Sequence, residues 1–322
     1  MITTTLFGQT KTGEDVHLFT LKNHDIEVQI TNYGGIIVSI LVPDKHNVKK
    51  NIVLGYKSLQ EYEEGTSYFG ALIGRVANRI HNGTYVLDGK TYRIPLHKDT
   101  PNALHGGPEG FNTKVWDAVP SENTLHLSYV SADGEMGFGG TVDVQVDYTL
   151  TEKGALEIAY QATTNSPTPI NLTNHSYFNL TGEEVSILNH HLYLNCDRYL
   201  PVDEDLIPTG EIKEVAGTEF DFTTSKAIEK GVYDHCMVLQ DSEDALKECA
   251  YVKEVESGRT LRVLTTMEGV QFYSGNFLEH KNTGFCLETQ RFPDAVNQEN
   301  FPSTILHPGE TYRELTVFEF NS

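Results

Sequence analysis

The chain has 322 residues, of which 39% are hydrophobic, a share that supplies a substantial core and is too high for a disordered chain. Its formal net charge is −21, so its surface repels phosphate backbones and anionic lipids, and nucleic acids and membranes are disfavoured as partners. The N-terminus has no basic and apolar leader, residues 36–42 are too few to cross a bilayer, and the four cysteines lack C-x-x-C spacing. We therefore expect a cytoplasmic protein with reduced thiols.

Strand patterns dominate the chain. Apolar residues alternate with polar ones over residues 26–30 and again, most clearly, over residues 142–150. Asp88-Gly89 separates two short apolar runs and predicts a β-hairpin, because both positions tolerate a positive φ. Further strands are predicted at residues 36–42, 156–160, 191–194, 261–265, 269–273 and 315–320, and helical turns at residues 58–63 and 224–229. We predict one all-β domain over residues 1–322, a sandwich of large antiparallel sheets with few short helices.

Residues 171–180 have two unlike faces when they are drawn as a strand, because side chains alternate with a period of two. One face carries a row of hydrogen-bonding groups, namely Asn171, Thr173, His175, Tyr177 and Asn179. Such a row suits a polar cleft that binds a sugar-like ring. An edge strand with one solvated face accounts for it equally well.

Two other segments carry polar groups that could face a ligand. Residues 74–80 hold two arginines and Asn78, which could form a polar clamp or a surface loop with salt bridges. His105 precedes two glycines, which would let the backbone come close to a ligand. A flexible loop with a bystander histidine is the simpler interpretation of that second segment.

The C-terminal third adds two strands with polar groups at alternate positions. Gln271 and Tyr273 share a face of the first, and Glu288 lies in the middle of the second. A carboxylate within an apolar strand is costly unless it is hydrogen-bonded or needed, although an ion pair with Arg291 or Arg313 would also explain it. Asp234 could accept hydrogen bonds from ligand hydroxyls or shape a turn.

Taken in order, six segments resemble the aldose 1-epimerase family, namely residues 74–80, 105–107, 171–179, 234–235, 269–276 and 288–294. Residues 304–312 are similar to the C-terminal segment of that family. The resemblance implies a galactose-mutarotase-like β-supersandwich with an open, shallow sugar cleft. It also implies that the protein interconverts the α and β anomers of free hexoses such as galactose and glucose, without a metal or a cofactor.

The resemblance further implies roles for individual residues. Glu288 matches the general base and His175 the general acid, and we hypothesise that Glu288 is ionised and His175 protonated at rest. Residues that hold the sugar or support the acid are Asn78, Arg79, His105, Ser176, Tyr177, Asp234 and Gln271. The stretch before Asp234 varies within the family. Tyr177 and Phe292 are candidates to stack on the sugar.

Other functions remain open on the sequence. A non-catalytic carbohydrate-binding β-sandwich would need the same polar groups, and a glycosidase could pair Glu288 with Asp234. A hexose-phosphate epimerase of the same fold would need a basic pocket, which a chain of this charge does not suggest. A zinc site of His105, His175 and Glu288 lacks the close spacing of metal motifs. Neither the preferred aldose nor the oligomeric state follows from the sequence.

Overall fold

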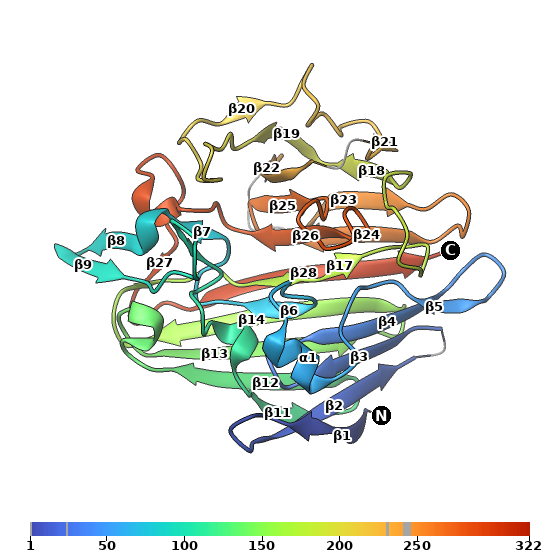
Figure 1. The fold of residues 1–322 in the computed structure, drawn as a ribbon, viewed down its shortest axis with the longest axis horizontal. Coiled ribbons are helices and arrows are strands. Elements are labelled where there is room, and N and C mark those ends of the chain that lie inside the picture. The colour runs from blue at the N-terminus through green and yellow to red at the C-terminus, as the bar shows by residue number, and fades with distance from the viewer. Residues whose placement is uncertain (1, 24, 230–231, 241–245) are drawn as a thin grey trace.

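Three large antiparallel sheets make up most of the computed structural model, which describes residues 2–23, 25–229, 232–240 and 246–322 (Figure 1). The nine-stranded sheet consists, in spatial order, of β11 (Asp117–Pro120), β12 (Thr124–Ser131), β13 (Val142–Leu150), β14 (Ala155–Thr164), β28 (Tyr312–Asn321), β24 (Thr260–Thr265), β23 (Lys247–Lys253), β18 (His191–Leu194) and β21 (Lys226–Ala227). All of its neighbouring strands are antiparallel. The predicted fold class is confirmed.

Two smaller sheets and four strand pairs complete the β-structure. The six-stranded sheet consists of β17 (Tyr177–Phe178), β26 (Phe285–Gln290), β25 (Gly269–Tyr273), β22 (Asp234–Leu239), β19 (Cys196–Tyr199) and β20 (Lys213–Glu214). The five-stranded sheet consists of β1 (Thr3–Gln9), β2 (Asp15–Lys22), β3 (Glu27–Thr31), β4 (Ile37–Pro43) and β5 (Lys49–Asn51). The pairs are β6 (Ala71–Ile73) with β16 (Thr173–His175), β7 (Arg79–Ile80) with β10 (Ala103–Leu104), β8 (Thr84–Leu87) with β9 (Lys90–Arg93), and β15 (Thr168–Pro169) with β27 (Ile305–Leu306).

Local sequence explains the most regular of these elements. Burial alternates along β13, so that Val144 and Val146 face the core while the residues between them face outward. The hairpin of β8 and β9 turns at Asp88 and Gly89, whose φ angles of 51° and 74° are both positive, as predicted.

Helical structure is confined to short pieces. The one α-helix of the described residues, α1 (Leu59–Glu64), begins after Ser58, whose side chain accepts a hydrogen bond from the N–H of Glu61 in a capping box. Short 3₁₀ turns cover His81–Gly83, Phe111–Thr113, Glu135–Gly137 and Ala295–Asn297. The predicted helical turn at residues 224–229 is wrong, because residues 226–227 form β21 and pair with β18 at the edge of the nine-stranded sheet. None of the described helices is long and apolar enough to span a membrane.

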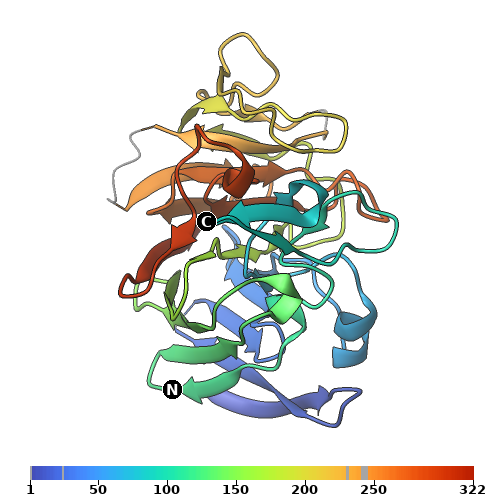
Figure 2. The same cartoon turned by 90° about the vertical axis from the view of Figure 1, so that its left-hand side faces the viewer.

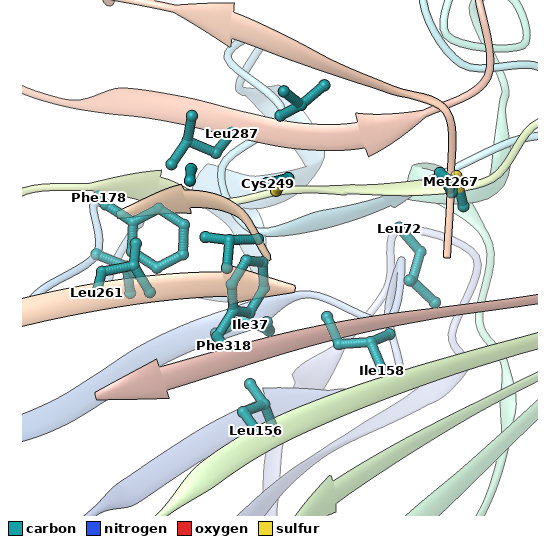
Figure 3. Close-up of a cluster of buried hydrophobic side chains, with 14 of the residues drawn as sticks. Ile37, Leu72, Leu156, Ile158, Phe178, Cys249, Leu261, Met267, Leu287 and Phe318 are labelled. Atoms are coloured by element: carbon teal, nitrogen blue, oxygen red, sulfur yellow. The ribbon is translucent and has the colours of Figure 1, made fainter. Parts of the chain in front are cut away.

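A continuous hydrophobic core joins the three large sheets. Figure 3 shows Ile37 from the five-stranded sheet, Ile158 and Phe318 from the nine-stranded sheet, and Phe178 and Leu287 from the six-stranded sheet in one cluster. Figure 2 shows β1 and β2, in dark blue, at the bottom of the molecule and β19 and β20, in yellow, at the top. The sheets therefore pack as the predicted sandwich.

Residues 171–180 cross from one sheet to another. The segment forms β16, which pairs with β6, and then β17, which pairs with β26, and the change of partner falls at Ser176. All ten residues are buried. The interpretation of this segment as an edge strand with a solvated face is therefore wrong.

Truncation of Phe178 should test the shared core. Phe178 is fully buried and contacts the rings of Phe285 and Phe318, with centroids 5.9 and 5.2 Å away. We expect Phe178→Ala to lower the free energy of unfolding by about 3–5 kcal/mol, since it leaves a cavity between sheets. Leu6→Ala, at a residue that is 65% exposed, should change it by less than about 0.5 kcal/mol. Urea unfolding measures both, and equal effects would contradict a single core.

Candidate active site

A cavity of about 200 Å³ opens beside the point where the chain changes sheets. Strands β16, β17, β22, β25 and β26 and the loops around residues 66–68, 104–105 and 277–278 form its walls. The lining residues are Thr66, Ser67, Tyr68, Asn78, Arg79, Leu104, His105, His175, Tyr177, Asp234, Tyr273, Phe277, Leu278 and Glu288. Seven of the nine predicted site residues are in this set, and the other two, Ser176 and Gln271, are not.

His175 and Glu288 face each other across the wall of this cavity. Nε2 of His175 lies 3.6 Å from Oε1 of Glu288, and the two residues are only 5% and 2% exposed. Oε2 of Glu288 has no hydrogen-bond partner within the described part of the protein, so it is available to accept a hydrogen bond from a ligand. The alternative pairing of Glu288 with Arg291 does not form, because the Arg291 guanidinium lies 2.6 Å from Glu314 instead.

Burial sets the protonation of this pair. Loss of water lowers the pKa of His175 to about 4. Burial, with a smaller contribution from the negative charge of Asp234, raises the pKa of Glu288 well above its usual value, and the positive charge of Arg79 opposes that rise. In the empty cavity the favoured state is a neutral imidazole beside a protonated carboxyl. Desolvation of both groups therefore opposes the charged resting pair that we hypothesised from the sequence.

His105 contributes a neutral ring with a defined tautomer. Its Nδ1 accepts a hydrogen bond of 3.2 Å from the main-chain N–H of Asn78, and burial lowers its pKa well below the usual value. A neutral imidazole with an acceptor at Nδ1 carries its proton on Nε2. His105 can therefore donate a hydrogen bond to a ligand oxygen.

This tautomer bears on the question of a metal. His105, His175 and Glu288 do come together, with one possible ligand atom of each within 4.8 Å of the others. Their wide spacing in the sequence did not suggest a metal site. The only lone pair of His105 is engaged by the N–H of Asn78, so this ring has none free for a cation. The donor set does not fit a zinc ion.

Aromatic rings hold the imidazole of His175 in place. It stacks between Tyr177 and Tyr68, with ring centroids 4.9 and 5.8 Å away and planes tilted by 21° in each case. The hydroxyl of Tyr68 is itself 3.1 Å from Nε2 of His97. Tyr68 lines the cavity with a φ of 56°, and no local sequence pattern marks that conformation, so it was not among the predicted site residues.

Asp234 is oriented by a residue outside the cavity. Nε2 of Gln271 donates a hydrogen bond of 2.6 Å to Oδ1 of Asp234, and Gln271 lies on β25 directly opposite Glu288 in the register. Gln271 therefore does not line the cavity itself, and it influences a ligand only by orienting the carboxylate of Asp234. Ser176, also predicted to bind the sugar, instead donates a hydrogen bond of 2.7 Å to Asn174.

Only one of the two arginines in residues 74–80 serves the cavity. Arg79 lines it, and the N–H of Arg79 bonds to the side chain of Asn78 at 2.8 Å. Arg75 is buried and donates to oxygens of the loops around Ser131 and Gly139. The predicted clamp is thus reduced to Arg79, and Arg75 holds loops together.

Gly106 is required beside His105 for a packing reason. Its φ is +85°, and a Cβ placed there would lie 2.0 Å from the carbonyl oxygen of Gly74. The close approach predicted for this loop is therefore made to the backbone of residue 74. It brings His105 next to the segment that carries Asn78 and Arg79.

Phe277, and not the predicted Phe292, is the phenylalanine that lines the cavity. Phe292 does not line the cavity; it packs against Phe301 in a separate hydrophobic cluster. Phe277 does line it, is 69% exposed, and lies beside Tyr273 with its plane tilted by 19°. It follows a Gly-Asn turn in the sequence, and only the position of that turn beside the cavity reveals it.

A larger cleft lies elsewhere on the protein. It has a volume of about 790 Å³ over β13, β14 and β28, and none of the predicted site residues lines it. Its most buried charges, Arg291 and Glu314, neutralise each other. The smaller cavity is the candidate active site because it gathers an acid–base pair, hydrogen-bond donors and aromatic rings.

Comparison with known proteins gives a consistent result. The family model described as aldose 1-epimerase matches residues 17–319. The chain is 43% identical to the galactose mutarotase of Rattus norvegicus, covering 99% of this chain and 98% of that one, and 42% identical to the galactose mutarotase of Homo sapiens over the same shares. It is 38% identical to the aldose 1-epimerase of Escherichia coli, covering 96% of both.

Solved structures agree with these relatives. The galactose 1-epimerase of Lactobacillus acidophilus superposes with a TM-score of 0.88 at 26% identity, covering 100% of this chain and 98% of that one. An aldose epimerase homologue from C. elegans superposes with a TM-score of 0.89 at 28% identity, covering 94% and 98%. The named relatives therefore match this chain over nearly its whole length, including the segments that carry the predicted site residues.

The protonation of His175 can be measured directly. Because its pKa is lowered to about 4, we expect the ring to stay neutral in the free protein from pH 8 down to about pH 5. Solvated histidines charge near pH 6.5. ¹⁵N NMR of the imidazoles, with His175→Asn to assign the signal, follows this titration. A charged His175 ring at pH 6 would contradict the neutral pair.

Proposed function

Because this chain belongs to the aldose 1-epimerase family, it is an isomerase that interconverts the α and β anomers of aldoses, and we propose that Glu288 and His175 carry its proton transfers. The observation that supports this assignment is the 3.6 Å approach of Nε2 to Oε1 at the wall of a cavity lined by polar and aromatic groups. We propose free galactose and glucose as substrates; the names of the relatives support galactose and, more broadly, aldoses.

Mutarotation needs one proton removed and one delivered. The Glu288 carboxylate takes the proton of the C1 hydroxyl, the His175 imidazolium gives a proton to the ring oxygen, and the C1–O5 bond breaks to leave an open-chain aldehyde. Rotation about C1–C2 presents the other face of the carbonyl, and the reverse transfers close the ring as the other anomer. Each positioned proton transfer typically contributes about 10²–10⁴ in rate.

The pair needs one exchangeable proton in total for this cycle. A protonated Glu288 beside a neutral His175 and an ionised Glu288 beside a charged His175 contain the same number of protons, so they are two microstates of one coupled pair. The empty cavity favours the first. The positive charge of Arg79, which lowers the pKa of Glu288, and the hydroxyls of a bound sugar favour the second. Substrate binding thus prepares the reactive state.

The other lining groups bind the sugar. Asp234 accepts hydrogen bonds from hydroxyls that do not react, and Arg79 and His105 donate to its oxygens. Tyr177 and Phe277 offer ring faces to the sugar's C–H groups. Among the lining residues, Arg79 is the one lysine or arginine, which suits an uncharged sugar better than a hexose phosphate.

The remaining proposals concern the whole chain. We propose that residues 1–322 form one domain, supported by the core that joins all three large sheets. A cytoplasmic location is supported by four cysteines that are all free and buried. The acidic surface disfavours nucleic acids and membranes as partners.

Glu288→Gln tests the base. The amide preserves size but cannot take a proton, so we expect kcat to fall by about 10²–10⁴ while the affinity for galactose changes little. Polarimetry of freshly dissolved α-galactose gives the rate, and calorimetry gives the affinity. Glu314→Gln is the matched control, because Glu314 is also buried but lies outside the cavity. Near-normal anomer exchange in Glu288→Gln would refute its assignment.

Asp234→Ala separates binding from catalysis. Since Asp234 contacts hydroxyls that do not react, its loss should raise KM by about tenfold or more and lower kcat much less. Gln271→Ala, which only releases Asp234, should change KM in the same direction by a smaller factor. Polarimetry over a range of galactose concentrations measures both constants. A loss confined to kcat would instead place Asp234 in the proton-transfer pair.

A further inference from the structure

Asn171, at the start of the segment that crosses between sheets, is hydrogen-bonded to Arg291, just after β26, and to residues 75 and 77, just before β7. We propose that Asn171 is a positioning residue that sets the separation of the acid and the base. This inference rests on the roles proposed for His175 and Glu288. It assigns Asn171 no contact with the sugar, since Asn171 is fully buried and does not line the cavity.

The acid and the base belong to different sheets. His175 lies on β16, which pairs with β6, while Glu288 lies on β26, which pairs with β17 and β25. Tyr177 on β17 is opposite Cys286 on β26. Continuing this antiparallel register by two residues puts His175 opposite Glu288. Within the described residues, however, no ladder of main-chain hydrogen bonds joins β16 to β26.

Unpaired side chains mark the place where the two strands separate. The next positions in the same register are Thr173 and Gln290, both fully buried. The hydroxyl of Thr173 and both polar atoms of the Gln290 amide have no hydrogen-bond partner within the described part of the protein. At Thr173 and Gln290, therefore, neither main-chain pairing nor a side-chain hydrogen bond joins β16, which carries His175, to β26, which carries Glu288.

Asn171 restores the connection with its side chain. Its Oδ1 accepts a hydrogen bond of 2.9 Å from the N–H of Arg291, and its Nδ2 donates one of 3.1 Å to the carbonyl oxygen of the same residue. A carboxamide that bonds to both main-chain groups of one residue imitates a paired strand. The connection lies four residues before His175 and three residues after Glu288.

The main chain of Asn171 ties in a third strand. Its N–H bonds to the carbonyl oxygen of Arg75 at 3.1 Å, and its carbonyl oxygen accepts from the N–H of Ala77 at 2.8 Å. The segment that leads to Asn78 and Arg79 is therefore joined at the same point. All four hydrogen-bonding groups of Asn171 are used: the two of its side chain bond to Arg291, and the two of its main chain bond to residues 75 and 77.

The chemistry explains why this junction matters more for turnover than for binding. The base and the acid must reach the C1 hydroxyl and the ring oxygen of one sugar together, and an error of about 1 Å in such a placement can cost about 10²-fold in rate. Asp234, by contrast, is held by Gln271 on β25 and does not depend on Asn171. Loss of the Asn171 side chain should therefore act on kcat.

The test compares Asn171→Ala with Asn179→Ala. Asn179 is a matched control, because it is 2% exposed and donates hydrogen bonds to the carbonyl oxygens of Val185 and Thr283, but lies beyond β17 and away from the gap. We expect both variants to lower the melting temperature. We expect kcat for galactose to fall by at least about tenfold in Asn171→Ala and to stay within about twofold in Asn179→Ala, with KM within about threefold in both.

A double variant isolates the route through the acid. In His175→Asn there is no acid left to align, so adding Asn171→Ala should change kcat by less than about threefold. If Asn171→Ala does not fold, Asn171→Asp takes its place, because it keeps the acceptor for the N–H of Arg291 and replaces the donor by an oxygen that repels the carbonyl oxygen of Arg291.

Each outcome decides the matter. Turnover within about twofold of the wild type in folded Asn171→Ala, an equal loss in Asn179→Ala, or an undiminished effect in the His175→Asn background would overturn the positioning role alone. Wild-type turnover in His175→Asn would instead overturn the proposed acid, and the inference with it.

Discussion

Removal of water from two titratable groups, His175 and Glu288, is the constraint on which the active site depends. Each group by itself is costly to charge in this environment, and burial shifts the pKa of each toward its neutral form. The same low dielectric strengthens every nearby charge and dipole. A pair that shares one proton under these conditions responds strongly to a sugar hydroxyl or to Arg79. The protonation of the pair therefore depends on the exclusion of water from the cavity and on the groups of a bound ligand.

The sheets supply this environment by opening at one place. β17 and β26 are paired, and the strands then separate at the level of His175 and Glu288, so that a cavity forms beside a gap in the ladder. The rings of Tyr68 and Tyr177 both stack with the imidazole of His175. The side chain of Asn171 bonds to the main chain of Arg291 beside this gap, while that of Arg75 holds neighbouring loops together. The polar residues of this region thus divide into those that line the cavity and those that hold the surrounding segments together.

The regular parts of the fold were predictable because their causes are local. The alternation over residues 142–150 favours a strand, and the Asp88-Gly89 turn favours a hairpin. In both cases the conformation depends on residues that are neighbours in the sequence. The prediction at residues 224–229 was wrong because a two-residue strand at a sheet edge owes its structure to its partner β18. Phe292 and Phe277 show the same limit within the site. Both are aromatic and near a polar motif, and only the packing of the loops decides which of them meets the cavity.

The sequence by itself determined the β-class of the protein, the strands with a strict period of two, and, through resemblance, the residues that the cavity gathers, including His175, Asp234 and Glu288. Only the tertiary structure decided that all of residues 171–180 are buried, that Ser176 and Gln271 do not line the cavity, and that burial shifts the pKa of both His175 and Glu288 toward their neutral forms. The physical reason is that periodicity and turn preference act between neighbours along the chain. Solvent exclusion and the pKa of a buried group depend on every segment that packs around it, and those segments lie far apart in the sequence.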